Sequence, residues 1–118
     1  MRRGKTQTVD GICFDSAPEA ARYLYLRDLQ RKGQIRQLQA HPRFDCRVRD
    51  GEGVEHHVCY YTPDFTYLDV NGAFRCEDVK GFRKSKKTGK PLPRVNREFG
   101  MKRKLMKILF GIEVEIVG

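Results

Sequence analysis

Residues 63–80 read PDFTYLDVNGAFRCEDVK, and this stretch decides how the middle of the chain folds. Two runs rich in β-forming residues, 60–70 and 73–79, are separated by Asn71-Gly72. An Asn-Gly pair between two such runs is the strongest short-range signal for a tight hairpin. The sequence therefore predicts two antiparallel strands that meet at this turn.

The second of these strands presents charged side chains on defined faces. Alternate side chains along a strand share a face, so Asp78 and Lys80 point one way while Glu77 and Val79 point the other. Pairing across the turn brings Asp64 toward Asp78. We therefore expect two carboxylates and one ammonium group at one end of a small sheet, which is an arrangement that suits a hard cation and phosphodiester hydrolysis.

Simpler explanations exist for each of these side chains. Pro-Asp pairs such as 63–64 are common in turns, and an acid-x-Lys triplet often forms only a surface salt bridge. The conjunction of Asp64, Asp78 and Lys80 across one hairpin favours a functional site. Glu77 is the second-choice ligand if the register slips by one residue.

The surrounding chain predicts an α+β fold, similar to an α/β sandwich, with a mixed central sheet of four to five strands flanked by two helices in the order α-β-β-β-α-β. Its length of 118 residues predicts a single domain, 1–118. The expected elements are a flexible basic arm at 1–10, a short strand or extended lead-in at 11–14, a helix at 18–32, strands at 35–40, 44–48, 57–69 and 73–80, an exposed basic loop at 82–95, a helix at 96–110 and a strand at 112–117.

Glu19 has two explanations that are not mutually exclusive. It stands three residues after Ser16, in the spacing of a capping box at the start of the first helix. A helix packed on the sheet can also bring this carboxylate to the rim of the site. The sequence alone gives the two explanations about equal support. His41 and Gln39 can line the same site, although a His beside a Pro in a strand break is more often structural.

The positive charge of the chain is concentrated in residues 80–107. This segment holds 12 of the 24 Lys and Arg residues and a single acid, Glu98, so its net charge of +11 exceeds the +9 of the whole chain. Most charge runs are only solvated surfaces, but this one begins directly after the candidate strand, which favours nucleic-acid binding. The residues expected to contact phosphates are Arg83, Lys84, Lys86, Lys87, Lys90, Arg94, Arg97 and Lys102.

The residue types in the site predict the cofactor and the reaction. Mg²⁺ takes oxygen ligands, so Asp64, Asp78 and the carbonyl of Val79 are the expected ligands, and Mn²⁺ is expected to substitute. Lys80 is expected to orient the attacking water or to stabilise the charged transition state. No apolar run approaches the ~20 residues of a membrane span, and we expect a cytoplasmic protein without a membrane partner.

Several short motifs together resemble the PD-(D/E)XK nuclease superfamily, and more closely its small phage and prophage members. The motifs are E-x-x-R-Y at 19–23, a Q-x-P-x-F stretch that is one residue longer here at 39–44, Asp-Phe at 64–65, E-D-V-K-G at 77–81 and F-G-I at 110–112. The resemblance covers most of the chain from about residue 14 onward.

This resemblance implies a restriction-endonuclease-like core with Glu19, Asp64, Asp78 and Lys80 as the catalytic set. It implies a Mg²⁺-dependent DNA endonuclease in the cytoplasm of a bacterial host. The small size favours an enzyme directed by DNA structure, such as a Holliday-junction resolvase acting in recombination, which is expected to dimerise to cut two strands. A non-catalytic DNA-binding protein and an RNA-directed nuclease or binder are the alternatives.

Overall fold

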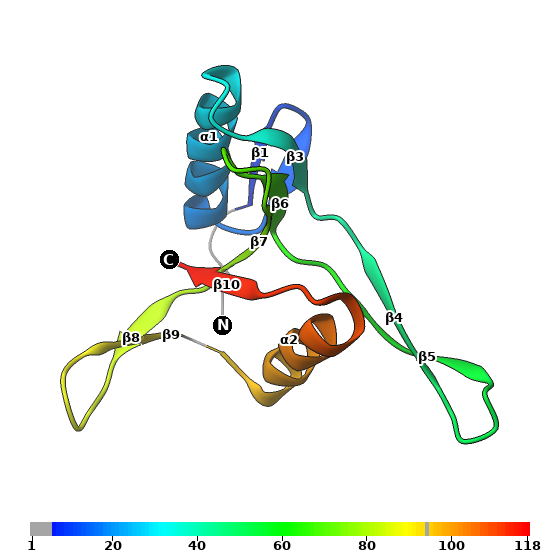
Figure 1. Cartoon of the computed structure of the whole chain (residues 1–118). Helices are drawn as coiled ribbons and strands as arrows, with labels where there is room; N and C mark the ends of the chain where they lie inside the picture. Colours follow the sequence, from blue (N-terminus) through cyan, green and yellow to red (C-terminus); the bar gives the residue numbers. More distant parts are fainter. Residues whose placement is uncertain (1–5, 94) are drawn as a thin grey trace.

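The structure is a computed structural model that describes residues 6–93 and 95–118, with the backbone alone at 82–84 (Figure 1). The helices are α1 (Ala17–Arg31) and α2 (Arg97–Phe110). The strands are β1 (Gln7–Val9), β2 (Ile12–Phe14), β3 (Arg36–Ala40), β4 (Phe44–Arg49), β5 (Glu55–Tyr61), β6 (Phe65–Leu68), β7 (Phe74–Val79), β8 (Phe82–Lys84), β9 (Pro91–Pro93) and β10 (Val114–Val117).

Four strands form the central mixed sheet, in the order β10-β7-β6-β3. β6 and β7 are antiparallel around the Asn71-Gly72 turn, where Gly72 has a φ of 80°, and β10 runs parallel to β7. Positive φ favours glycine because a Cβ atom would clash with the backbone there. The predicted α+β class, the mixed four-stranded sheet and the hairpin at this turn are thus confirmed.

The two helices pack on opposite faces of this sheet (Figure 1). α1 begins after the N-cap Ser16, and its buried Tyr23 and Leu26 pack with Phe65 of β6. α2 begins after Asn96, and its buried Met106 packs with Cys76 of β7 and with β10. The apolar stripe of each helix thereby covers one side of β6 and β7, which fixes the side chains that reach either face.

One predicted strand, 57–69, is wrong as a single element. It breaks at residues 62–64, and β5 pairs with β4 in a separate two-stranded hairpin while β6 joins the central sheet. Pro63 lies at the break because proline has no N–H to donate to a strand ladder. The simple order α-β-β-β-α-β is correspondingly incomplete, since further strands lie in short hairpins outside the central sheet.

Two segments predicted to lack regular structure contain strands. Within the predicted arm 1–10, residues Gln7–Val9 pair with β2, and Asp10 accepts hydrogen bonds from Tyr23 and Arg27 of α1. Residues 1–5 of that arm lie outside the described residues. Within the predicted loop 82–95, β8 and β9 pair as a hairpin. The residues of this segment show no hydrophobic period, so the sequence pattern did not reveal the hairpin.

The β4–β5 and β8–β9 hairpins both project from the body of the molecule, on different sides of α2 (Figure 1). Their strands are paired with each other and not with the central sheet. None of the described helices combines the length and the apolar character that crossing a membrane requires.

Candidate functional site

A polar pocket of about 440 Å³ lies where the end of β7 meets the beginnings of both helices. All four residues predicted to be catalytic line it. The full lining is Asp15, Glu19, Tyr60, Tyr61, Thr62, Asp64, Asp78, Val79, Lys80, Asn96, Glu98, Phe99 and Lys102. Three elements that are far apart in sequence, namely α1, the β6–β7 hairpin and α2, therefore contribute to one site.

The β6–β7 hairpin brings the two aspartates together as predicted. The N–H of Asp64 donates to the carbonyl of Glu77 (3.0 Å), which continues the ladder by one residue and sets Asp64 opposite Asp78. The N–H of Val79 donates to Asp64 Oδ2 (2.6 Å), so this carboxylate is oriented by the backbone of the strand that carries Asp78. Val79 itself lines the pocket.

Lys80 and Tyr61 complete the surroundings of Asp78. The Nζ atom of Lys80 lies 3.6 Å from Asp78 Oδ1 and 4.4 Å from the centre of the Phe99 ring. The hydroxyl of Tyr61 donates a short hydrogen bond to Asp78 Oδ2. Asp78 and Lys80 thus lie on one face of the strand, as the two-residue strand period predicts, and that face is oriented toward α2.

Glu19 supplies only the backbone half of the predicted capping box, and its side chain lies in the pocket as the second explanation predicts. Its backbone N–H donates to Ser16 Oγ (3.4 Å), while its side chain lies in the pocket. Glu19 Oε2 is buried and has no hydrogen-bond partner among the described residues. His41 Nε2 lies 3.9 Å from this atom, and ligand atoms of Glu19, His41 and Asp64 all lie within 4.8 Å of one another.

A family model described as a protein of unknown function (DUF1064) matches residues 2–110. The chain belongs to the DUF1064 family. No curated protein and no solved structure matches it. Every residue that lines the pocket lies inside the part of the chain that the DUF1064 model covers.

The acidic side chains of this DUF1064 pocket lie close together and are partly buried. Burial, and secondarily the neighbouring Asp78, raises the pKa of Asp64. Burial, and secondarily Asp15, raises the pKa of Glu19. Raised carboxyl pKa values mean that the pocket disfavours the full negative charge of its acids, and a bound cation would remove that penalty.

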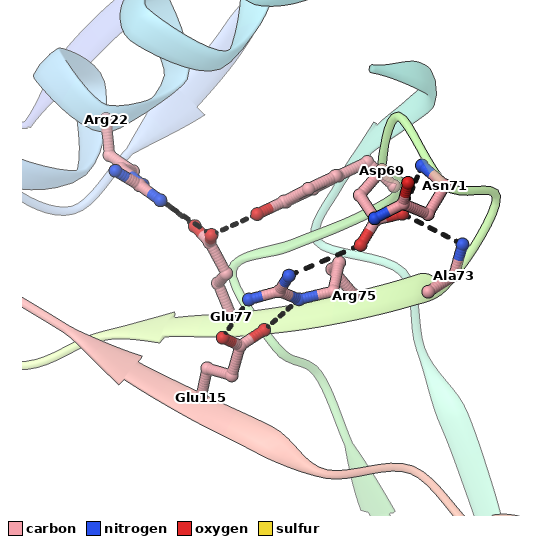
Figure 2. Close-up of polar contacts among 8 residues, drawn as sticks. Arg22, Asp69, Asn71, Ala73, Arg75, Glu77 and Glu115 are labelled. Atoms are coloured by element: carbon pink, nitrogen blue, oxygen red, sulfur yellow. Dashed lines mark hydrogen bonds and ion pairs between the residues drawn. The ribbon is translucent and has the colours of Figure 1, made fainter. Parts of the chain in front are cut away.

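Glu77, the second-choice ligand, lies on the opposite face of β7, which α1 covers. Glu77 points away from the pocket and binds Arg22 of α1, so the register does not slip and Asp78 is the acid beside Lys80. Figure 2 shows this pair together with the neighbouring Arg75–Glu115 pair.

The predicted phosphate-contacting residues fall into three groups. Lys102 lines the pocket, where its Nζ atom lies 3.5 Å from Glu98. Four others are exposed and form no ion pair within the described part of the chain: Lys86, Lys87, Lys90 and Arg97. Arg94 and the side chains of Arg83 and Lys84 lie outside the described residues.

Sequence reasoning missed seven of the residues that line the DUF1064 pocket, among them Tyr61 and Asp15. Tyr61 precedes the strand break and Asp15 precedes the helix cap, and neither position carries a local signal of function. His41 was expected only as a residue that can line the site, and the structure places it near Glu19 and Asp64. Gln39 is exposed and is not among the lining residues.

Proposed function

We propose that this DUF1064 chain is a metal-dependent endonuclease that hydrolyses DNA phosphodiester bonds on a restriction-endonuclease-like core. The observation that carries the proposal is the convergence of Glu19, Asp64, Asp78 and Lys80 in one pocket. Several acids beside a lysine are suited to hold a cation and to receive a negatively charged phosphate at the same time.

The donor groups of the pocket fit a divalent cation. Asp64, Asp78 and Glu19 offer carboxylate oxygens, which Mg²⁺ and Mn²⁺ prefer, and His41 offers a ring nitrogen nearby. The buried oxygen of Glu19 that lacks a hydrogen-bond partner among the described residues is the clearest sign of such a ligand, because buried polar atoms are ordinarily hydrogen-bonded. When bound, the ion supplies a water of lowered pKa and offsets charge on the phosphate.

The remaining roles belong to the protein's own side chains. Hydrolysis joins a water oxygen to phosphorus and breaks the bond to one sugar oxygen, which leaves with a proton. Lys80 is placed to hold the attacking water or to stabilise the charge that develops on the phosphate oxygens. Tyr61 fixes one oxygen of Asp78 and the Val79 N–H fixes one oxygen of Asp64, so both aspartates are preorganised.

The distribution of basic residues supports DNA as the substrate. Lys86, Lys87 and Lys90 on the β8–β9 hairpin follow closely after Lys80 in the chain and have no acidic partner among the described residues. Lysines of this kind bind phosphates without reading sequence. By the resemblance of its motifs, we propose an enzyme directed by DNA structure, acting as a homodimer on branched DNA in the cytoplasm of a phage-infected or prophage-carrying bacterium.

The test is a cleavage assay with Mg²⁺ or Mn²⁺ on linear, nicked, flapped and four-way DNA, with RNA alongside. We expect cleavage of at least one DNA substrate, no cleavage in EDTA, and a loss of roughly 100-fold or more for Asp78→Asn with DNA binding retained. The matched control is Asp28→Asn, which alters an exposed α1 acid paired with Lys32 outside the pocket.

Three outcomes would contradict the proposal. Undiminished cleavage by Asp78→Asn would remove the pocket as the active site. Metal-independent binding without cleavage of any substrate would favour the non-catalytic alternative. Cleavage restricted to RNA would replace the substrate.

A further inference from the structure

A second buried polar cluster lies behind the pocket, on the face of β7 that α1 covers. The guanidinium group of Arg22 binds Glu77 with two hydrogen bonds, from Nε to Oε1 (2.8 Å) and from Nη2 to Oε2 (2.6 Å), as Figure 2 shows. The hydroxyl of Tyr67 donates a further short hydrogen bond to Glu77 Oε2. The Glu77 side chain is only 2% exposed, so these contacts are shielded from solvent.

Each member of this cluster belongs to an element that also supplies or adjoins an acid of the pocket. Arg22 lies one helical turn after Glu19 on α1, and Glu77 directly precedes Asp78 on β7. Tyr67 lies on β6, the strand that begins just after Asp64. The contacts of Glu77 therefore connect the three segments whose carboxylates meet in the pocket.

α1 and the β6–β7 hairpin need a stabilising contact because the carboxyl groups that they bring to the pocket repel one another when ionised. Glu19, Asp64 and Asp78 lie at short range, and wherever more than one of them is ionised their repulsion favours separation of α1 from the β6–β7 hairpin. A bidentate Arg–carboxylate pair resists such movement better than a single contact, since two parallel bonds fix orientation as well as distance. Neither Arg22 nor Glu77 lines the pocket, so this pair does not compete with a ligand bound there.

We infer that Arg22, Glu77 and Tyr67 are positioning residues, which hold α1 against the hairpin so that Glu19 stays within reach of a cation held by Asp64 and Asp78. This inference rests on the proposed metal-dependent function and adds to it. It predicts that loss of the cluster weakens metal binding more than it weakens the fold or the affinity for DNA.

The informative variant replaces the ion pair with apolar groups. Arg22→Ala alone would leave the buried Glu77 charge unpaired and endanger folding, whereas an apolar pair of similar volume is often tolerated. We therefore choose the double variant Arg22→Met/Glu77→Leu. Its matched control is Arg75→Met/Glu115→Leu, which removes the other bidentate Arg–Glu pair of β7 (Figure 2), where neither residue adjoins a pocket acid.

Metal binding is measured first on the protein without DNA, by titration calorimetry with MnCl₂ alone. DNA affinity in EDTA and the thermal midpoint are recorded for each variant. We expect Arg22→Met/Glu77→Leu to weaken Mn²⁺ binding roughly tenfold, with DNA affinity within about twofold, and the control to bind Mn²⁺ within about twofold of wild type. Cleavage should need more Mn²⁺ for half its maximal rate and should recover substantially at saturating Mn²⁺.

The outcomes separate the two proposals. Failure of the wild-type protein to bind Mn²⁺ would overturn the proposed function, and the positioning role with it. If the wild-type protein binds Mn²⁺ and the folded Arg22→Met/Glu77→Leu variant binds it with the same affinity, the positioning role alone is overturned. Equal weakening by both double variants would also overturn it, because the effect would then reflect a general loosening of β7. If the double variant does not fold, Tyr67→Phe, which removes one hydroxyl from the same cluster, must weaken Mn²⁺ binding measurably or the inference fails.

Discussion

Two neighbouring carboxylates, Glu77 and Asp78, lie on opposite faces of β7 in opposite electrostatic environments. Glu77 is enclosed by Arg22 and Tyr67, so its charge is neutralised inside the protein. Asp78, the next residue, lies in a pocket with further acids, one of which has a buried oxygen without a hydrogen-bond partner among the described residues. A charge that is paired within the chain serves the fold, whereas a crowded set of like charges without enough partners indicates a ligand.

The two projecting hairpins repeat this contrast on the surface. In the β4–β5 hairpin, Arg47 binds Asp45 and Glu55. In the β8–β9 hairpin, the exposed Lys86, Lys87 and Lys90 form no ion pair within the described residues. The β8–β9 hairpin therefore keeps the positive charge of these lysines available for phosphates, whereas Arg47 of the β4–β5 hairpin is already paired with acids.

The largest expected effect contrasts the two faces of β7 in stability. Arg22→Ala should lower the free energy of unfolding by about 3–5 kcal/mol, because it leaves the buried Glu77 carboxylate unpaired. Lys80→Met on the pocket face should change it by less than about 1 kcal/mol, because the Lys80–Asp78 pair is longer, Lys80 is partly exposed, and Asp78 keeps its hydrogen bond from Tyr61. Urea denaturation at neutral pH measures both. Similar losses for the two variants would show that the faces do not differ.

The next effect contrasts the hairpins in DNA binding. Replacing Lys86, Lys87 and Lys90 together by Gln should weaken binding roughly tenfold at low salt, and the slope of log K against log salt should fall by about 0.9 for each phosphate that the variant no longer neutralises. The control is Arg47→Gln on the β4–β5 hairpin, where the arginine is already paired with acids. Fluorescence anisotropy over a salt series measures the slope, and an unchanged slope for the triple variant would exclude this hairpin from the interface.

The smallest expected effect concerns the pH dependence of stability without metal. The pKa values of Asp64 and Glu19 are raised in the folded protein, mainly by burial, so the folded state holds protons that the unfolded chain has released. Stability should therefore fall as pH rises above the ordinary carboxyl range near 4. Asp64→Asn removes part of this cost and should stabilise the metal-free protein by about 1 kcal/mol at neutral pH.

Thermal melts in EDTA between about pH 5 and pH 8 give the measurement, because carboxylates with lowered pKa titrate below that range. The control is Asp10→Asn, since hydrogen bonds from Arg27 and then Tyr23 lower the pKa of Asp10 and its charged form stabilises the fold. That variant should lose stability. A steeper decline with pH for Asp64→Asn than for wild type would contradict the raised pKa.

The sequence was informative wherever a local pattern had a single physical solution. Asn71-Gly72 demanded a tight turn, and the two-residue period of the next strand put Asp78 and Lys80 on one face and Glu77 on the other. Ser16 and Gly111 marked a helix start and a helix end that the structure confirms. Such features depend on backbone geometry within a few residues, and local sequence alone reveals them.

The local sequence pattern gave wrong predictions where the structure depended on which strands pair with one another. The run 57–69 looked continuous because both halves are rich in β-formers, yet its halves joined different sheets on either side of Pro63. The β8–β9 hairpin has no hydrophobic period in its sequence, so the local pattern did not predict it. Neither outcome follows from propensity, because strand pairing is a contact between segments.

By itself the sequence determined the two helices, the central hairpin, the placement of Asp64 opposite Asp78 and the excess of positive charge that follows. Only the tertiary structure decided that α1 brings the Glu19 carboxylate to those aspartates, with His41 nearby, and that Arg22 pairs with Glu77 on the α1 side of β7. The reason is distance along the chain. Arg22 and Glu77 are 55 residues apart, and nothing but the packing of α1 on the sheet makes them neighbours.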